Sequence, residues 1–325
     1  MLRVCFLMLK VPLVLVVAMV LFSLYQIICS VTMVTTYNHN EPYMEPELRH
    51  TTLLPSSKLL FPAIRNMTFN KNISLIGKMQ TTYFDDMSYS NLFMYFQPII
   101  TPDERNFMLL TFDTFIRACQ SANITYFLYG GTLLGAYRHH GIIPWDDDID
   151  VMLNYSEKQT IRAVLSNIPN FGLFSPYKRQ WKFYHKGLTT LKTKPYRWPF
   201  IDIFLFGENE THIWDNIPHY KEDFVYKKSD VFPLQYRPFE EVLLPVPCYI
   251  LNVLVTNYLI HVCSTTNYLH KIEAGSPSIY KKNVSCKKLY AIYPFVFRHQ
   301  TSDSVIESLM MNGRKIRSVT LPKYY

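Results

Sequence analysis

Four aspartates stand among the five residues 146–150, directly before an apolar stretch. Like charges this close repel one another, and an unpaired carboxylate is costly to bury. Side chains alternate between the two faces of a strand, which places Asp146, Asp148 and Asp150 on one face and Asp147 on the other. A hard divalent cation prefers carboxylate oxygens and would offset the repulsion. We therefore predict that Asp146, Asp148 and Asp150 bind Mg²⁺ or Mn²⁺.

Two other interpretations apply to this acidic cluster. A solvated acidic turn is disfavoured because Trp145 and further apolar residues flank the cluster. A calcium loop of the EF-hand type needs a Gly and a Glu at fixed offsets, and the sequence lacks them.

A third carboxylate for phosphoryl transfer is offered by Asp202, the only charged residue in the apolar run 199–206. We expect Asp148, Asp150 and Asp202 to be the catalytic residues. The alternative for Asp202 is a single polar residue on the solvent face of a strand.

A glycine pair follows the apolar run 124–129 and precedes the acidic cluster. Glycine lets the backbone approach a ligand closely, and exposed N–H groups in such a turn can bind phosphate. Arg138, His139 and His140 lie between this turn and the aspartates, and a cation there would help to neutralise a diphosphate. Ordinary turns also use glycine pairs. The residues predicted to bind the donor are Gly130, Gly131, Thr132, Arg138 and His139.

Helices and strands must position these residues, and their signals alternate along the chain. Thr101-Pro102-Asp103-Glu104 predicts a capping box and a helix to about Ser121, with Cys119 on its apolar face. Strands are expected at 124–129, in the acidic segment and around Asp202, and a second capping box is expected at Ser156. This order predicts an α/β or α+β fold, a mixed sheet flanked by helices.

The N-terminus carries a targeting signal. Residues 11–34 contain no charge and are long enough to cross a bilayer, although a cleaved signal peptide is the alternative. Arg3 and Lys10 precede this stretch and no Lys or Arg follows until Arg49, so the remainder of the chain is predicted to be luminal. The expected regions are a cytosolic tail (1–10), a transmembrane anchor (11–34), a luminal stem (35–100), a catalytic domain (101–270) and a basic extension (271–325).

Composition and cysteine usage agree with a luminal domain. The chain has 325 residues, is 49% hydrophobic and carries a net charge of +8, which excludes a disordered or coiled-coil protein. Six Asn-x-Ser/Thr sequons follow the anchor. We expect Cys119 to be a core thiol and a disulfide to form among Cys248, Cys263 and Cys286, with the pairing open. The extension has ten Lys/Arg and three Asp/Glu, which indicates a solvated basic surface or a patch for an anionic substrate or a membrane. A nucleic-acid partner is not expected behind a secretory anchor.

The segment YGGTLLGAYRHHGIIPWDDDIDV resembles the signature of the LicD family, which includes bacterial phosphocholine transferases and animal fukutin-type proteins. WPFIDIFLF resembles the second acidic strand of that family, and the resemblance extends over about residues 104–270. Asp147 and Cys248 depart from the usual residues at their positions.

The resemblance implies a nucleotidyltransferase-like fold and a metal-dependent phosphotransferase. Such an enzyme moves ribitol phosphate or phosphocholine from a CDP-linked donor to a glycan hydroxyl. It also implies a single-pass type II protein of the Golgi or endoplasmic reticulum membrane that works beside other glycosylation enzymes. The alternatives are a glycosyltransferase that uses a sugar nucleotide and a non-catalytic luminal assembly factor.

Overall fold

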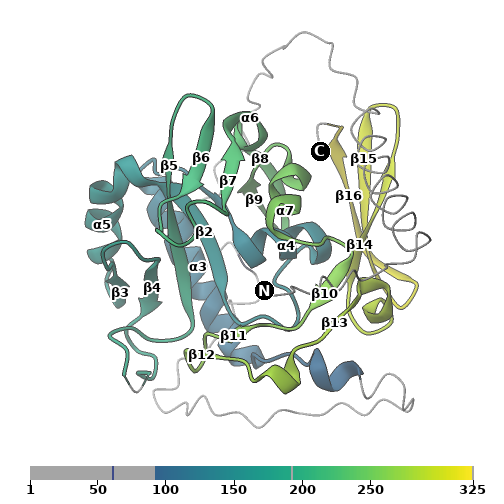
Figure 1. The fold of residues 1–325 in the computed structure, drawn as a ribbon, viewed down its shortest axis with the longest axis horizontal. Helices are drawn as coiled ribbons and strands as arrows, with labels where there is room; N and C mark the ends of the chain where they lie inside the picture. The colour runs from purple at the N-terminus through teal and green to yellow at the C-terminus, as the bar shows by residue number, and fades with distance from the viewer. Residues whose placement is uncertain (1–60, 62–91, 192, 324–325) are drawn as a thin grey trace, which may run out of the picture. The chain divides into compact units, whose positions relative to one another are not determined.

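The computed structural model describes residue 61, residues 92–191 and residues 193–323 (Figure 1). The described residues all belong to one compact unit, Ser57–Tyr325.

The predicted anchor, residues 11–34, and most of the predicted stem lie outside the described residues. Among the helices that the structure describes, none combines the length and apolar character needed to cross a membrane. The sequons at Asn66 and Asn72 also fall outside, whereas Asn123, Asn209 and Asn283 are exposed.

Helix α3 (Pro102–Ser121) begins and ends where the sequence predicts. The Thr101 side chain accepts a hydrogen bond from the Glu104 amide, and the Thr101 amide donates to the Glu104 carboxylate at 2.8 Å, so the capping box forms. Cys119 is a buried free thiol on the inner face of this helix, as predicted.

A seven-stranded mixed sheet forms the centre of the unit (Figure 1). The main order is β1-β2-β5-β4-β3, and β6 continues from β5 to β7. Only β2 and β5 are parallel among the pairs of this sheet that the structure describes. The strands are β1 (Tyr126–Leu128), β2 (Ile149–Asn154), β3 (Phe171–Phe174), β4 (Trp181–His185), β5 (Phe200–Glu208), β6 (His212–Asp215) and β7 (Val225–Lys227). The mixed sheet flanked by helices confirms the predicted α/β class.

The strand register aligns charged residues on one face of the sheet. Asp150 of β2 lies beside Asp202 of β5, and Lys182 of β4 lies on the other side of Asp202. Residues directly across neighbouring strands share a face, so these three form a row. The opposite face carries apolar residues such as Phe183, which packs against Phe115 of α3 with ring centroids 6.3 Å apart.

The glycine pair opens helix α4 (Gly130–His139) and so forms its first turn. The predicted capping box at Ser156 is wrong. The Asn154 side chain already accepts the Ser156 amide at 2.9 Å and starts the 3-10 turn η2 (Tyr155–Glu157). Helix α5 (Lys158–Ser166) then follows without a side-chain cap.

The remaining elements are short and largely belong to the C-terminal half. They are α6 (Lys228–Val231), α7 (Ile250–Asn257), β8 (Gln235–Phe239), β9 (Val242–Val246), β10 (Val262–Ser264), β11 (Tyr268–Leu269), β12 (Ala274–Gly275), η3 (Ser278–Tyr280), β13 (Asn283–Ser285), η4 (Cys286–Leu289), β14 (Phe295–Gln300), β15 (Ser304–Met311) and β16 (Arg314–Pro322).

Strands β14, β15 and β16 form an antiparallel sheet that a buried ion network joins to the preceding part of the chain. Glu307 of β15 bonds His140 at 2.7 Å, Arg298 at 2.7 Å, and Arg237 of β8. The described part of the predicted extension therefore lies in the same compact unit as the predicted catalytic domain, and residue 270 does not separate two packed bodies.

Candidate active site

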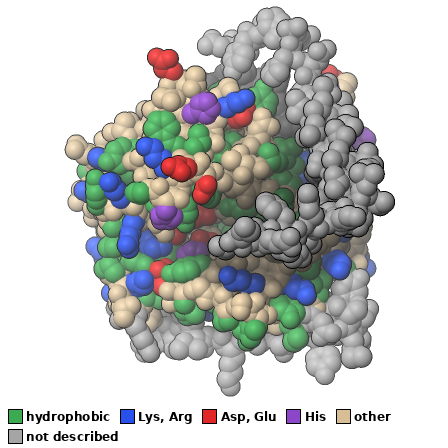
Figure 2. All heavy atoms as spheres, viewed as in Figure 1, with side chains coloured by type: hydrophobic (Ala, Val, Ile, Leu, Met, Phe, Trp, Pro, Cys, Tyr) green, Lys and Arg blue, Asp and Glu red, His purple; other side chains and the backbone are tan. Residues whose placement is uncertain are grey.

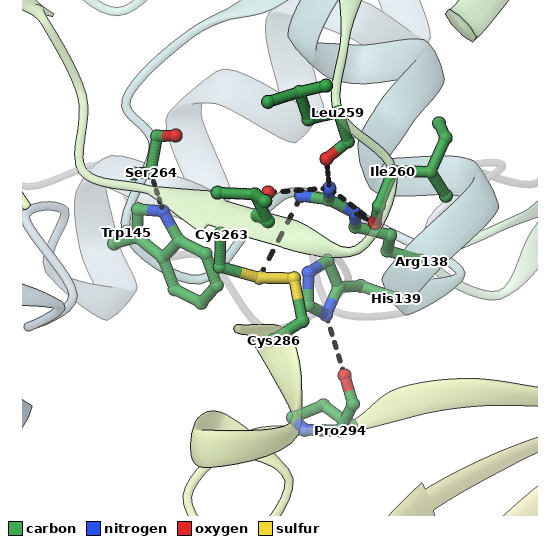
Figure 3. Close-up of a disulfide and its surroundings, with 10 residues drawn as sticks. Arg138, His139, Trp145, Leu259, Ile260, Cys263, Ser264, Cys286 and Pro294 are labelled. Carbon is green, nitrogen blue, oxygen red and sulfur yellow. Dashed lines mark hydrogen bonds between the residues drawn. A yellow bond between two sulfur atoms is a disulfide. The ribbon is translucent and has the colours of Figure 1, made fainter. Parts of the chain in front are cut away.

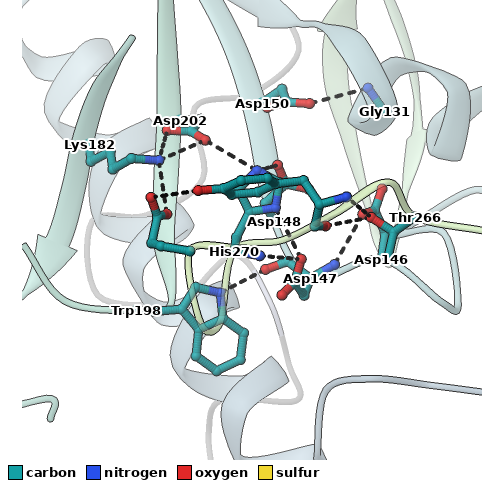
Figure 4. Close-up of polar contacts among 12 residues, drawn as sticks. Gly131, Asp146, Asp147, Asp148, Asp150, Lys182, Trp198, Asp202, Thr266 and His270 are labelled. Carbon is teal, nitrogen blue, oxygen red and sulfur yellow. Dashed lines mark hydrogen bonds and ion pairs between the residues drawn. The ribbon is translucent and has the colours of Figure 1, made fainter. Parts of the chain in front are cut away.

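Three buried carboxylates come together at the start of β2 and β5. One oxygen each of Asp148, Asp150 and Asp202 lies within 4.8 Å of the other two (Figure 4). The donor set is entirely carboxylate oxygen, which suits Mg²⁺ or Mn²⁺. Asp202, which the sequence predicts as a catalytic residue, thus also lies where a third ligand of the metal ion would lie.

Asp146 borders this group from the side of α4. A Cβ atom added to Gly131 would lie 3.0 Å from Asp146 Oδ2 and 3.8 Å from Asp150 Oδ2. Both carboxylates therefore face the first turn of α4, although Asp146 is not one of the three whose oxygens cluster within 4.8 Å.

The carboxylates lie where their charged forms are disfavoured. Burial, followed by repulsion from Asp148, raises the pKa of Asp146 and of Asp150 well above the usual range. Burial also raises the pKa of Asp202, and it raises that of Asp148 to about 6. A bound cation would offset both the burial and the repulsion. The chemistry of the site therefore fits a metal ion.

The first turn of α4 fixes Asp150. The Gly131 amide donates to Asp150 Oδ2 at 3.2 Å, and Thr132 Oγ1 accepts the Asp150 amide at 2.7 Å. Gly130 has φ +53°, and a Cβ at this position would lie 2.6 Å from Asp150 Oδ2. Gly131, predicted to bind a donor phosphate, thus donates to the carboxylate of Asp150, which the sequence predicts to be a metal ligand, at the positive end of a helix. Thr132 bonds the backbone amide of the same residue.

Asp147 borders the cluster on the side of His270, since one of its oxygens lies within 4.8 Å of an Asp148 oxygen and of a His270 ring nitrogen. Its side chain is fully buried and accepts hydrogen bonds from the amides of His270, at 3.2 Å, and Lys271, at 2.8 Å. It also bonds His270 Nδ1 at 3.1 Å. The predicted alternation is wrong at this position, because β2 begins only at Ile149 and the three preceding aspartates are not part of the strand. Asp147 instead bonds the β11–β12 segment next to Asp148.

His270 enters the acidic cluster from this segment, and the sequence does not predict it. Its Nε2 lies 3.2 Å from Asp148 Oδ2 and 4.0 Å from Asp202 Oδ2. Burial lowers the pKa of His270, but the Asp148 charge and the contacts with Asp147 and Asp202 raise it to about 10. The imidazole is therefore cationic at neutral pH.

Lys182 is the second cation that the sequence does not predict. Its Nζ lies 2.8 Å and 3.1 Å from the two Asp202 oxygens and 3.7 Å from Glu273. Glu273 in turn accepts hydrogen bonds from Tyr196, at 2.6 Å, and Tyr268, at 3.2 Å. The sequence could have indicated this contact, because Lys182 is a single lysine in the aromatic segment WKFYH and Asp202 is the only charged residue in the apolar run 199–206. Two isolated opposite charges in apolar strands are candidates for a pair.

Arg138 and His139 are not brought to the acidic cluster (Figure 3). The Arg138 guanidinium donates to the carbonyls of residues 259, 260 and 262, with its shortest contact 2.6 Å to Ile260, and it lies beside the Cys263–Cys286 disulfide. His139 Nδ1 bonds the Pro294 carbonyl at 2.6 Å, and burial lowers its pKa to about 3. Both side chains therefore hold the C-terminal segments in place.

The disulfide selects one of the open pairings and leaves Cys248 as a buried free thiol. It joins β10 to η4, and Trp145 Nε1 donates to Ser264 of β10 at 2.9 Å. These contacts connect the acidic segment to the part of the chain that carries His270. Acidic and histidine side chains are visible side by side near the middle of the face in Figure 2.

Residues 123–249 match the family model described as the LicD/FKTN/FKRP nucleotidyltransferase domain. The match confirms the resemblance to the LicD family.

Relatives of this chain include both uncharacterized and named proteins. An uncharacterized protein of Rickettsia prowazekii is 31% identical over 124 residues, which cover 37% of this chain and 42% of that protein. The lipopolysaccharide cholinephosphotransferase LicD of Haemophilus influenzae is 55% identical over 47 residues, 14% of this chain and 18% of that protein. The mouse ribitol-5-phosphate transferase FKTN is 23% identical over 146 residues, 44% of this chain and 30% of that protein. The chain thus spans less than half the length of each of these relatives.

The segment that matches the LicD model contains the three clustered carboxylates, the glycine pair and Lys182. His270 and Glu273 lie beyond its last matched residue. The site is therefore assembled from the segment that matches the LicD model together with a segment that follows it in the chain.

Proposed function

We propose that this protein is a metal-dependent phosphotransferase that moves a phospho-alcohol from a CDP-linked donor to a hydroxyl of a glycan. The convergence of Asp148, Asp150 and Asp202 within a LicD domain is the observation that carries the proposal. Ribitol phosphate and phosphocholine are the proposed groups, because the relatives include a ribitol-5-phosphate transferase and a cholinephosphotransferase.

Asp148, Asp150 and Asp202 would hold Mg²⁺ or Mn²⁺, with Asp146 assisting beside Gly131. The metal supplies Lewis-acid stabilisation of phosphate charge when bound. Gly131 and Thr132 keep Asp150 in position through the hydrogen bonds to its carboxylate and its amide.

Asp202 orients the acceptor hydroxyl and accepts its proton. The acceptor oxygen forms a bond to the phosphorus that bears the alcohol, and the P–O bond to CMP breaks. Lys182, held on both Asp202 oxygens, fixes this carboxylate and keeps it ionised until the proton arrives. His270 and Lys182 lie beside the carboxylates, where positive charge also favours an incoming diphosphate.

We also propose that residues 11–34 anchor the protein in the Golgi or endoplasmic reticulum membrane with the LicD domain in the lumen. The uncharged stretch, the preceding basic residues and the exposed sequons support this location. A glycan acceptor and neighbouring glycosylation enzymes would then be its partners.

The test uses the full-length protein in detergent with Mg²⁺ or Mn²⁺ and a mixture of glycoprotein-derived oligosaccharides. CDP-ribitol, CDP-choline, CDP-glycerol and UDP-sugars are supplied separately, and release of CMP or UDP is measured. We expect CMP release from one CDP-alcohol, lost in Asp150→Asn and kept in the matched variant Asp303→Asn, which alters an exposed turn. UDP release would instead indicate a glycosyltransferase, and no release from any donor would indicate a non-catalytic protein.

A further inference from the structure

A basic cavity lies apart from the acidic site, between α5 and the loop that joins β3 to β4. Its volume is about 840 Å³, which falls within the usual range for sites that bind small ligands. Lys158 and Arg162, one helical turn apart on α5, line one wall, and Lys178 and Arg179 of the loop line the other. No Asp or Glu is among the lining residues. The cavity therefore presents four positive charges without a carboxylate.

The same four cations form no ion pair with a carboxylate elsewhere in the part of the chain that the structure describes. Figure 2 shows Lys and Arg side chains gathered over the region that Figure 1 labels α5, β3 and β4. Their charges are thus available to an anionic ligand.

Aromatic rings underlie three of the cations. Lys158 Nζ lies 4.0 Å from the centre of the Tyr155 ring and donates to its hydroxyl at 2.6 Å. The Arg162 guanidinium lies 5.1 Å from the centre of the Trp181 ring, and Lys178 Nζ lies 5.2 Å from that of Tyr177. Cation–π contacts of this kind restrict the cations to the cavity walls. Tyr177 is 80% exposed at the rim, so its ring can stack against a further group.

Neutral polar groups complete the lining. Gln159, Ser166, Ser175 and Asn216 offer amides and hydroxyls that can bond the hydroxyls of a sugar. An oligosaccharide that carries an anionic group fits this lining. The cations would bind its charge, the exposed ring would stack on a sugar, and the amides and hydroxyls would bond its hydroxyl groups. A single inorganic ion would leave most of the volume unfilled.

The position of the cavity separates it from the chemistry. Trp181 lines the cavity, whereas Lys182, the next residue on β4, bonds Asp202. Successive residues of a strand point to opposite faces, so the cavity and the acidic cluster lie on opposite faces of the sheet. A ligand in the cavity can bind while the acidic site stays open.

We propose that this cavity binds an oligosaccharide carrying a phosphate, sulfate or carboxylate group. The identification of this oligosaccharide as part of the acceptor rests on the proposed function, whereas binding itself does not. The cavity then selects and holds a glycan-bearing acceptor through an anionic branch away from the reacting hydroxyl.

The experiment measures binding of labelled sulfated, phosphorylated and sialylated tetrasaccharides, and their neutral counterparts, to the full-length protein by fluorescence anisotropy. The cavity variant is Arg162→Gln/Lys178→Gln. The control Lys287→Gln/Lys288→Gln removes the same charge from exposed residues outside the cavity. We expect at least one anionic tetrasaccharide to bind, with affinity at least about tenfold weaker in the cavity variant and unchanged in the control.

Two further variants separate this inference from its rivals. Tyr177→Ala should weaken tetrasaccharide binding but not competition by inorganic sulfate. Asp150→Asn should leave tetrasaccharide binding unchanged, so a failed transfer assay with intact binding would refute the proposed reaction alone. The cavity proposal is refuted by equal weakening in both charge variants, by loss of binding in Asp150→Asn, by an unaffected Tyr177→Ala, or by no binding up to about 1 mM.

Discussion

Replacing Gly130 by alanine tests whether the start of α4 determines the position of Asp150. Gly130 has φ +53°, a conformation that costs a residue with a Cβ about 1–2 kcal/mol. The new Cβ would lie 2.6 Å from Asp150 Oδ2, whereas ordinary contact begins at 3.4 Å. The carboxylate must therefore move by 3.4 − 2.6 = 0.8 Å. Such a shift breaks the hydrogen bond from Gly131, at a further cost of about 1.5–3 kcal/mol.

Gly313 provides a matched control because it combines the same kind of backbone with open space. Its φ is +72°, and no atom lies within 4 Å of a Cβ added there. Gly313→Ala should therefore lose only the backbone contribution of about 1–2 kcal/mol. Gly130→Ala should lose about 2.5–5 kcal/mol in total.

The assay is urea unfolding of the full-length variants with and without Mn²⁺, followed by CMP release. We expect Mn²⁺ to stabilise wild type and Gly313→Ala but not Gly130→Ala, and CMP release to be lost only in Gly130→Ala. Equal losses of stability in the two variants, with Mn²⁺ stabilisation and turnover kept in both, would refute the argument that α4 and Asp150 are in close contact.

Three other predictions concern the charges and links around the site. Among the described residues, Lys182→Met removes the cation nearest to buried Asp202 and leaves only His270, at 4.0 Å. We therefore expect unfolding to become about 3–5 kcal/mol easier in calorimetry and Mn²⁺ to restore part of the loss. The basic partners of Glu307 lower its pKa from 4.5 to about 2 despite burial. Its ionised form therefore contributes about 3 kcal/mol to the free energy of unfolding above pH 4.5, and this contribution is lost as the pH falls toward 2. Glu307→Gln should flatten the dependence of unfolding free energy on pH between these values. Removing the disulfide in Cys263→Ser/Cys286→Ser opens a link across 23 residues and should lower the free energy of unfolding by about 3 kcal/mol, measured against wild type in urea.

Local signals in the sequence were sufficient for the elements that position the first ligands. The capping box at Thr101 and the helical spacing that puts Cys119 on the inner face fix α3 within a residue, because both are set by neighbours three or four positions apart. Alternation applies only from Ile149, where β2 begins, so it places Asp150 but not the three aspartates before it. The isolated Asp202 is also informative, since a buried strand tolerates a charge only with a partner.

The partners themselves were not predictable, because they depend on strand register and on distant chain segments. Lys182 meets Asp202 only because β4 pairs antiparallel with β5 in one register. A shift of one residue would turn Lys182 to the opposite face. His270 lies 123 residues after Asp147 and well beyond Asp202 in the chain, and no local pattern predicts its place beside them. Arg138 shows the opposite error. Its place between the glycine pair and the aspartates predicts a phosphate ligand, but its side chain bonds the carbonyls of residues 259–262.

The charges of the assembled site give an independent reason to expect a bound cation. Asp146, Asp148, Asp150 and Asp202 lie around one place, and the cations found in contact with them are Lys182 and His270. Four ionised carboxylates and two cations would leave an excess of negative charge in a buried site. Without a further cation, the carboxylates can lose this charge only by taking up protons, as their raised pKa values indicate. A diphosphate donor of the proposed kind would add further negative charge to this site. Under the proposed function, a cation held by these four carboxylates would also offset the charge of the donor.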